Sequence, residues 1–149
     1  MKKTLFSILL SGVVVFAFAQ TEEIAIKNVL NEETKAFYDR DAHKMVSYWH
    51  QTPQTTMYII ISPAHVIDTR GASFNADSIQ KNMLGGEPLK IDFHRENWIF
   101  CINDNSAYVT FDQISNDTQA KQYTHETRFM EKINGSWKIV SSNVVFVDR

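Results

Sequence analysis

The spacing of apolar residues is helical up to Pro53 and mostly strand-like after it. From Glu22 to Tyr38 apolar side chains recur at helical spacing opposite an acidic face, which predicts an amphipathic helix. The stripe consists of Ile26, Val29, Leu30, Glu33, Phe37 and Tyr38. Asp41 can cap a second, short helix, because its side chain can accept from the amides that follow. The apolar face of that helix is Ala42, Met45, Val46 and Trp49, and Pro53 ends the helical region.

Beyond Pro53 the pattern is that of strands, interrupted by one further helix. Short strands are expected at residues 57–61 and 65–67, and a third helix at residues 75–84, stopped by Gly85-Gly86. Four longer strands follow at residues 89–102, 106–115, 122–133 and 136–147. The connections at residues 103–105, 116–117 and 134–135 are rich in turn formers, and Asn134-Gly135 is a strong hairpin signal. The pattern predicts an α+β domain with three helices on one side of a meandering sheet.

The N-terminal residues have the form of a signal peptide. Lys2 and Lys3 precede an uncharged, mostly apolar run that ends in Ala17-Phe18-Ala19. The run is shorter than the roughly 20 residues a spanning helix needs. We therefore expect a signal peptide at residues 1–19, one domain at residues 20–149 beginning at Gln20, and a periplasmic or secreted protein with no membrane attachment after cleavage. An uncleaved N-terminal anchor is the alternative.

Composition narrows the classes of function. The formal net charge of −2 becomes more negative once Lys2 and Lys3 are removed, and there is no basic stripe, which argues against nucleic-acid binding. Cys101 is the only cysteine and lies in an apolar run, so we expect a small buried side chain. The five histidines do not have the spacing of a zinc site. No metal and no cofactor are expected.

The element order and three segments resemble one superfamily. The segments are FYDRD (37–41) with MVSYW (45–49), AYVTFDQ (107–113), and Glu126-x-Arg128 with EKINGSWKI (131–139). Together they are similar to the SnoaL-like branch of the nuclear transport factor 2-like (cystatin-like cone) superfamily. The resemblance implies a strongly curved mixed or antiparallel sheet of about six strands, wrapped round a long helix to leave a conical cavity. It also implies that dimers are common, while the activity stays open, because one fold hosts many functions.

Ketosteroid isomerase, an enzyme of this superfamily, provides a test of activity. Its catalytic groups are a base carboxylate, a tyrosine and a protonated acid. By the resemblance the base should lie on the first strand, where residues 56–62 contain no acid. The places of the other two groups lie near Glu33 and Phe129. Isomerase chemistry of that kind is therefore disfavoured.

The final hairpin carries the principal candidates for a site. Glu126 and Arg128 lie on the same face of a strand, about 7 Å apart along it. Arg128 can therefore pair with Glu126 or with a bound carboxylate. The alternative is a solvated surface pair, but the Glu-x-Arg pattern is part of the resemblance, so we expect both residues to line the cavity.

Four further residues are weaker pocket candidates. Gln113 shares a strand face with apolar residues, and the alternative is a solvated strand end. His94 stands among charged neighbours, where an exposed histidine is the simpler interpretation. Trp49 and Tyr58 could form an aromatic mouth, although a tryptophan on an amphipathic helix is more often part of the core.

Three functions remain open. The first is a binding domain whose cavity holds a small, partly apolar molecule. An anionic group on that molecule is one option, since Arg128 could pair with it. The second is a cofactor-independent lyase, isomerase or hydrolase, with Glu126 or His94 as proton carrier and Arg128 as anion stabiliser. The third is a protein-interaction domain that uses the open sheet face. We also expect a homodimer packed sheet to sheet, with Val109, Phe111, Val145 and Val147 as contributors to the interface.

Overall fold

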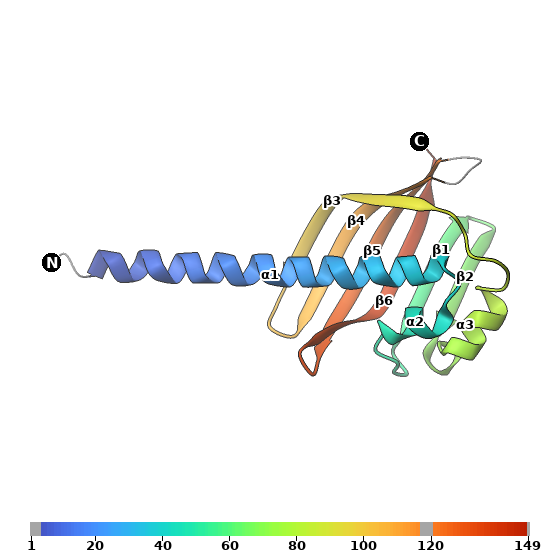
Figure 1. Ribbon diagram of the computed structural model, residues 1–149, viewed down its shortest axis with the longest axis horizontal. Helices are drawn as coiled ribbons and strands as arrows, with labels where there is room; N and C mark the ends of the chain where they lie inside the picture. Colours follow the sequence, from blue (N-terminus) through green and yellow to red (C-terminus); the bar gives the residue numbers. More distant parts are fainter. Residues whose placement is uncertain (1–3, 117–120, 149) are drawn as a thin grey trace.

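The computed structural model of the chain describes residues 4–116 and 121–148 (Figure 1). Of residues 4–19 it describes the main chain. Lys2 and Lys3 of the expected signal peptide lie outside the described residues, as does Asp117 of one expected turn.

Three α-helices and a short 3-10 helix form the helical part of the fold. They are α1 (Thr4–Tyr38), α2 (Ala42–Ser47), η1 (Gly71–Ser73) and α3 (Ala76–Asn82). Asp41 caps α2 by accepting from the amide of Lys44 at 2.9 Å, and Asn75 caps α3 by accepting from the amide of Ser78 at 2.9 Å. Both short helices therefore begin where a side-chain acceptor is available for their free amides.

The strands form one mixed sheet that is not closed. They are β1 (Thr56–Ser62), β2 (His65–Arg70), β3 (Asp92–Ile102), β4 (Ser106–Asn116), β5 (Lys121–Ile133) and β6 (Ser136–Val147), in the order β2-β1-β6-β5-β4-β3. All neighbours are antiparallel except β1 and β6, which run parallel. In Figure 1 the C-terminal part of α1 crosses the face of this sheet, with α2 and α3 beside the β1–β2 end. The predicted α+β fold is confirmed.

The turn between β5 and β6 has the conformation that its sequence predicts. Asn134 has φ 50° and Gly135 has φ 79°, so both central residues adopt the left-handed region. A two-residue hairpin turn of this kind matches the twist of the flanking strands and favours Asn-Gly. The turn fixes the register of β5 against β6, with Ile133 opposite Ser136.

The core lies between α1 and the inner face of the sheet. Ile26 and Leu30 on α1 are fully buried, as are Val109 and Phe111 on β4. The prediction that Val109 and Phe111 contribute to an exposed outer face is therefore wrong: the alternation of β4 turns both toward α1. The outer face instead exposes other large apolar side chains on the long strands, namely Ile99, Tyr108 and Phe129.

Cys101 is exposed, so the prediction of a buried thiol is also wrong. The register of β3 against β4 shifts between Glu96 and Ile99, and Asn97 has φ 55° there. Beyond this bulge Trp98 and Phe100 pack against the core while Ile99, at 66% exposure, and Cys101 point outward. The apolar run is an alternating edge strand rather than a fully buried one.

Helix α1 continues without a break through the expected cleavage site after Ala19. Its N-terminal part extends beyond the sheet (Figure 1). Within residues 4–116 and 121–148, no helix combines the length and apolar character that crossing a membrane requires. Cleavage after Ala19 stays a prediction.

Candidate functional site

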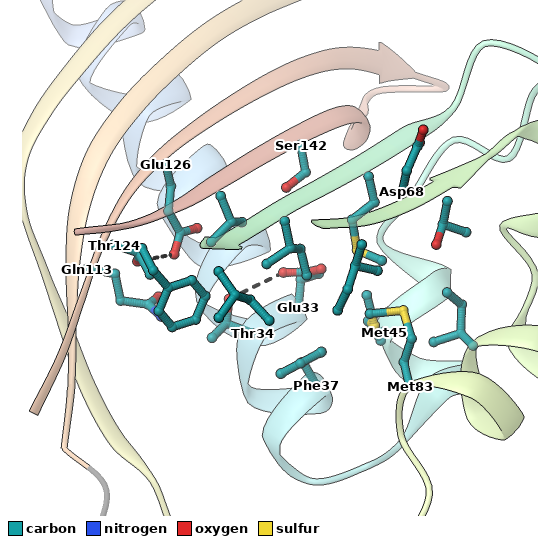
Figure 2. Close-up of a pocket in the computed structure, with 18 of the residues that line it drawn as sticks. Glu33, Thr34, Phe37, Met45, Asp68, Met83, Gln113, Thr124, Glu126 and Ser142 are labelled. Atoms are coloured by element: carbon teal, nitrogen blue, oxygen red, sulfur yellow. Dashed lines mark hydrogen bonds between the residues drawn. The ribbon is translucent and has the colours of Figure 1, made fainter. Parts of the chain in front are cut away.

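A cavity of about 940 Å³ lies between the helices and the inner face of the sheet. Its walls come from α1, α2, α3, β1, β2, β4, β5 and β6. In Figure 2, Glu126, Thr124 and Gln113 lie together at one end, whereas Met45 and Met83 lie at the other. The cavity therefore has a polar end on β4 and β5, and the remainder is lined by apolar side chains together with polar ones from β2 and α3, among them Asp68 and Ser78.

Glu126 and Arg128 form a buried ion pair at the polar end. Their exposed fractions are 3% and 4%, and Arg128 Nη2 donates to Glu126 Oε2 at 2.6 Å. Thr124 Oγ1 donates to the other carboxylate oxygen of Glu126 at 2.8 Å. Arg128 Nη1 donates to the carbonyl oxygens of Thr127 at 3.2 Å and Asn143 at 3.5 Å. Arg128 Nε is buried and has no hydrogen-bond partner among the described residues.

Gln113 forms the second part of the polar end. Its Oε1 accepts from Arg95 Nε at 2.9 Å, and its Nε2 donates to Ser115 Oγ at 3.1 Å and to the Tyr38 hydroxyl at 3.3 Å. The Tyr38 and Ser115 hydroxyls also share a hydrogen bond of 2.9 Å. Burial raises the pKa of Tyr38 above its ordinary value, so this phenol stays protonated at neutral pH.

Arg95 supports this wall from behind the cavity. It donates from Nη2 to Thr34 Oγ1 at 2.5 Å and from Nη1 to Asn31 Oδ1 at 2.9 Å, and its guanidinium lies 4.6 Å from the centroid of Phe111. Burial lowers the pKa of Arg95 to about 10, partly offset by attraction to Glu126, which leaves a cation at neutral pH. Arg95 thereby links α1, β3 and β4 and fixes the amide orientation of Gln113.

Glu33 brings a second carboxyl group into the cavity, from α1. It is 5% exposed, and it accepts from Trp49 Nε1 at 3.0 Å and from Thr34 Oγ1 at 3.3 Å. Burial raises the pKa of Glu33, opposed by the attraction of Arg128, the bond from Trp49 and the attraction of Arg95. The side chain lies in the middle of the cavity in Figure 2.

The structure brings together three of the six candidate residues from the sequence. Glu126, Arg128 and Gln113 line the polar end of the cavity. Their role in binding stays a prediction.

The other three candidates lie elsewhere, which corrects the predicted pocket. His94 is exposed on β3, because strand alternation turns its neighbour Arg95 inward instead. Tyr58 lies on the face of β1 opposite the cavity-lining Met57 and Ile59, with the Arg70 guanidinium 5.8 Å from its ring centroid. Trp49 is 3% exposed and belongs to the core, where it supports Glu33 rather than forming a mouth.

Sequence reasoning missed Glu33, Tyr38 and Arg95 as members of the polar network. Glu33 did carry a signal, because an acid within an otherwise apolar helical stripe faces the interior. The inward direction of the Arg95 side chain could not be predicted, because the bulge at Asn97 breaks the strand alternation between Arg95 and Trp98. Among the described residues no group of three or more His, Cys, Asp or Glu side chains is arranged to hold a metal ion.

Several solved structures share the fold of this chain, although no similar sequence identifies its family. No protein-family model matches the sequence, and no curated protein matches it. An NTF2-like protein of unknown function from Pseudomonas putida is similar with a TM-score of 0.66 at 12% identity, over 85% of this chain and 87% of that one. A cystatin-like fold protein from Nostoc punctiforme has a TM-score of 0.65 at 11% identity, over 84% and 90% of the two chains.

A ketosteroid isomerase-like protein from Erwinia carotovora atroseptica is also similar in structure. Its TM-score is 0.61 at 11% identity, over 85% of this chain and 96% of that one. Identities this low establish the fold alone, so the SnoaL-like branch stays a prediction. The chain has the nuclear transport factor 2-like, or cystatin-like, fold that its sequence predicts.

Proposed function

We propose that this domain binds a small molecule that has an apolar body and a head group able to accept hydrogen bonds. The observation that carries the proposal is Arg128, a buried cation at the end of a cavity, whose Nε lacks a hydrogen-bond partner among the described residues. A buried donor without a partner is unfavourable by about 1–3 kcal/mol. An acceptor atom of a ligand would remove that cost.

The apolar walls support the second half of the proposal. Ile59 and Ile67 from the β1–β2 hairpin face the cavity, as do Val144 and Phe146 from β6. The volume of about 940 Å³ is within the roughly 300–1,000 Å³ range of small-molecule sites. Removing apolar ligand surface from water contributes about 25 cal/mol per Å², so the walls supply affinity and the polar end supplies orientation.

A cavity-filling substitution tests this function. Nile red, an uncharged dye whose fluorescence rises in apolar surroundings, serves as the probe. We expect the wild-type protein to enhance its fluorescence and Val144→Trp to abolish most of the enhancement, because the indole occupies the cavity. Val66→Trp is the matched control, since Val66 is 44% exposed on β2 and does not line the cavity.

The two variants together decide the result. Equal enhancement by wild-type protein and Val144→Trp would place the dye elsewhere and contradict the proposal. Loss of enhancement in Val66→Trp would do the same, because it would indicate binding to the outer surface.

A second candidate function is a cofactor-independent proton-transfer enzyme of the lyase, isomerase or hydrolase type. The two carboxyl groups of the cavity favour it: burial raises the pKa of Glu33, whereas Glu126 is held in an ion pair with Arg128. Two acids in different environments can divide the roles of proton donor and acceptor. His94 is not part of this candidate, because it lies outside the cavity. Deuterium incorporation into a bound ketone or hydroxy acid, lost in Glu33→Gln, would support it.

We further propose that the domain acts in the periplasm or outside the cell. The apolar run that ends in Ala17-Phe18-Ala19 supports export. Packing supports the same boundary: Glu22, just beyond Ala19, accepts from Lys132 Nζ and from Trp137 Nε1, each at 2.6 Å. The helix is thus tied to the β5–β6 hairpin by residues that cleavage would leave in place.

A further inference from the structure

The polar end of the cavity is surrounded by two cations and two acids, so its net charge depends on the protonation of Glu33. Arg95 and Arg128 are cations, Glu126 is the carboxylate of the ion pair, and Glu33 is a second acid. With Glu33 ionised the four side chains sum to zero formal charge. An anion that entered this end would then leave one uncompensated negative charge, which a buried site opposes strongly.

Protonation of Glu33 removes this excess negative charge. If Glu33 is neutral, the remaining three groups carry one net positive charge, which one anionic head group compensates. Arg128 offers the contact, because its Nε is buried, faces no acceptor among the described residues, and belongs to a guanidinium suited to carboxylates.

We infer that the natural ligand is an apolar molecule with one carboxylate, which binds at Arg128 Nε while Glu33 takes up one proton. The inference rests on the proposed binding function and adds to it the class of ligand and the linked proton. The ligand carboxylate accepts from Arg128, and the Glu33 carboxyl gains its proton from solvent, so that charge is conserved at the site.

Several elements present titratable groups to Glu33. Arg95 comes from β3, and Glu126 and Arg128 come from β5. Tyr38 of α1 lines the same cavity. His65 and Asp68 on β2 line the same cavity, with Asp68 bonded to Arg70 at 2.7 Å. A ligand carboxylate adds a negative charge to this set, and its effect on Glu33 has the same direction as the effect of Glu126, which raises the pKa of Glu33.

The environment of Glu33 suits a group that changes its charge. Burial already raises its pKa, so the proton binds more readily than to a solvated glutamate. Trp49 and Thr34 donate to its two oxygens, and they also hold the side chain in place. Because a glutamine retains an acceptor for Trp49, Glu33→Gln is a permanent mimic of the protonated form.

Calorimetry with a matched pair of probes tests the inference. Decanoate carries the carboxylate, and decanol has the same chain without the charge. Titration of decanoate in two buffers of different ionisation enthalpy should reveal uptake of about one proton per ligand at pH values where free Glu33 is ionised. The dissociation constant of decanoate should then rise by up to about tenfold per pH unit. Decanol should exchange no proton.

Substitution of Glu33 identifies the group that takes up the proton. In Glu33→Gln, decanoate should bind with no proton uptake and with the affinity of the wild-type protein at low pH. Glu32→Gln is the control, because Glu32 is exposed next to Glu33 on α1 and pairs with Lys44 at 3.2 Å. That variant should behave as wild type.

The outcomes separate this inference from the binding function. Decanol binding without decanoate binding would overturn the carboxylate as the ligand's head group and leave the binding function intact. Decanoate binding without proton uptake would overturn the linked proton and also leave the binding function intact. Uptake that persists in Glu33→Gln would overturn the role of Glu33. Failure of decanoate, decanol and Nile red alike would overturn both proposals together.

Discussion

Arg128 and Glu126, two residues apart on β5, bond to each other inside the cavity rather than at the surface, with Nη2 and Oε2 2.6 Å apart. Alternate residues of a strand share a face, so the pair lies on the side that α1 covers. The charged residues of the β5–β6 hairpin therefore fall into two groups with different structural roles. Glu126 and Arg128 line the cavity, whereas Lys132 bonds to Glu22 of α1.

Breaking the buried pair should be strongly destabilising. Arg128→Met retains length and apolar volume but removes the cation, leaving Glu126 buried without its closest partner. We expect the free energy of unfolding to fall by about 3–5 kcal/mol. Replacing both residues by methionine should recover much of the loss, because no buried charge is left unpaired. Urea unfolding of the two single variants and the double variant measures the coupling.

A surface ion pair is the control for this cycle. Lys44 and Glu32 lie 3.2 Å apart with side-chain exposures of 41% and 49%. Lys44→Met should leave the unfolding midpoint unchanged within error. Coupling between Glu126 and Arg128 as weak as that of this surface pair would contradict burial of the pair.

Glu33 should make stability depend on pH in an identifiable direction. Its folded-state pKa is raised above the ordinary value of 4.5, so the folded protein holds the proton more tightly than the unfolded chain. The stability that Glu33 contributes is thus fully present below the unfolded pKa and is lost as pH rises through the folded pKa. Glu33→Gln should remove this loss, so the stability of the variant relative to the wild-type protein should increase with rising pH. Thermal unfolding measured over a range of pH checks this. A difference that does not vary with pH would contradict the assignment.

Arg95 and His94 are adjacent in sequence, but their substitution by alanine should have very different effects on the free energy of unfolding. Arg95→Ala removes the donors to Gln113, Thr34 and Asn31, and we expect a loss of about 3 kcal/mol or more. His94→Ala changes an exposed side chain and should stay within about 0.5 kcal/mol. Denaturant unfolding of both variants makes the comparison. Equal effects would contradict the inward position of Arg95, and a larger effect of His94→Ala would indicate that the opposite face of β3 meets the core.

The outer sheet face should mediate a homodimer. Tyr108 lies opposite both Phe129 and Cys101 in the sheet, and Ile99 is exposed beside them on β3. We expect light scattering to give a dimer at tens of micromolar protein and Tyr108→Glu to give a monomer. The Cys101 thiol should react with a maleimide in native monomer and be protected in the dimer. A monomeric wild-type protein would refute this assembly.

Processing should remove residues 1–19. Intact mass of protein recovered from the native host should correspond to a chain that begins at Gln20. An N-terminal glutamine can cyclise with loss of ammonia, so a species lighter by one ammonia is also expected. A mass that retains Met1–Ala19 would contradict cleavage.

The sequence predicts the fold well because its local signals agree with one another. Asp41 and Asn134-Gly135 each mark a boundary through a specific capping or turn interaction, and both occur where expected, while Asn75 caps α3 at the start of the predicted third helix. Glu126 and Arg128 could be placed together because strand alternation is a local property.

Residues whose role depends on packing between distant elements could not be placed in the same way. Arg95 bonds to Asn31 and Thr34, which lie more than sixty positions earlier in the chain. Cys101 faces outward because of a single bulge at Asn97. The pattern of apolar residues does not predict this bulge. Tyr58 was misplaced for a related reason, since the face of β1 that lines the cavity depends on how the helices cover the sheet. Trp49 was misplaced because it belongs to the core, where it donates to Glu33.

The place of β1 and β2 in the sheet determines how the cavity can change over evolution. The polar end rests on β4 and β5, which have a neighbouring strand on both sides, whereas β2 is an edge strand and β1 joins the sheet through a parallel pairing with β6. Ile59, Ile61 and Ile67 therefore belong to a peripheral hairpin. Substitutions there can resize the apolar compartment while Glu126, Arg128 and Gln113 keep their geometry. Relatives with this arrangement can diverge in the size of molecule they accommodate without losing the chemistry of the polar end.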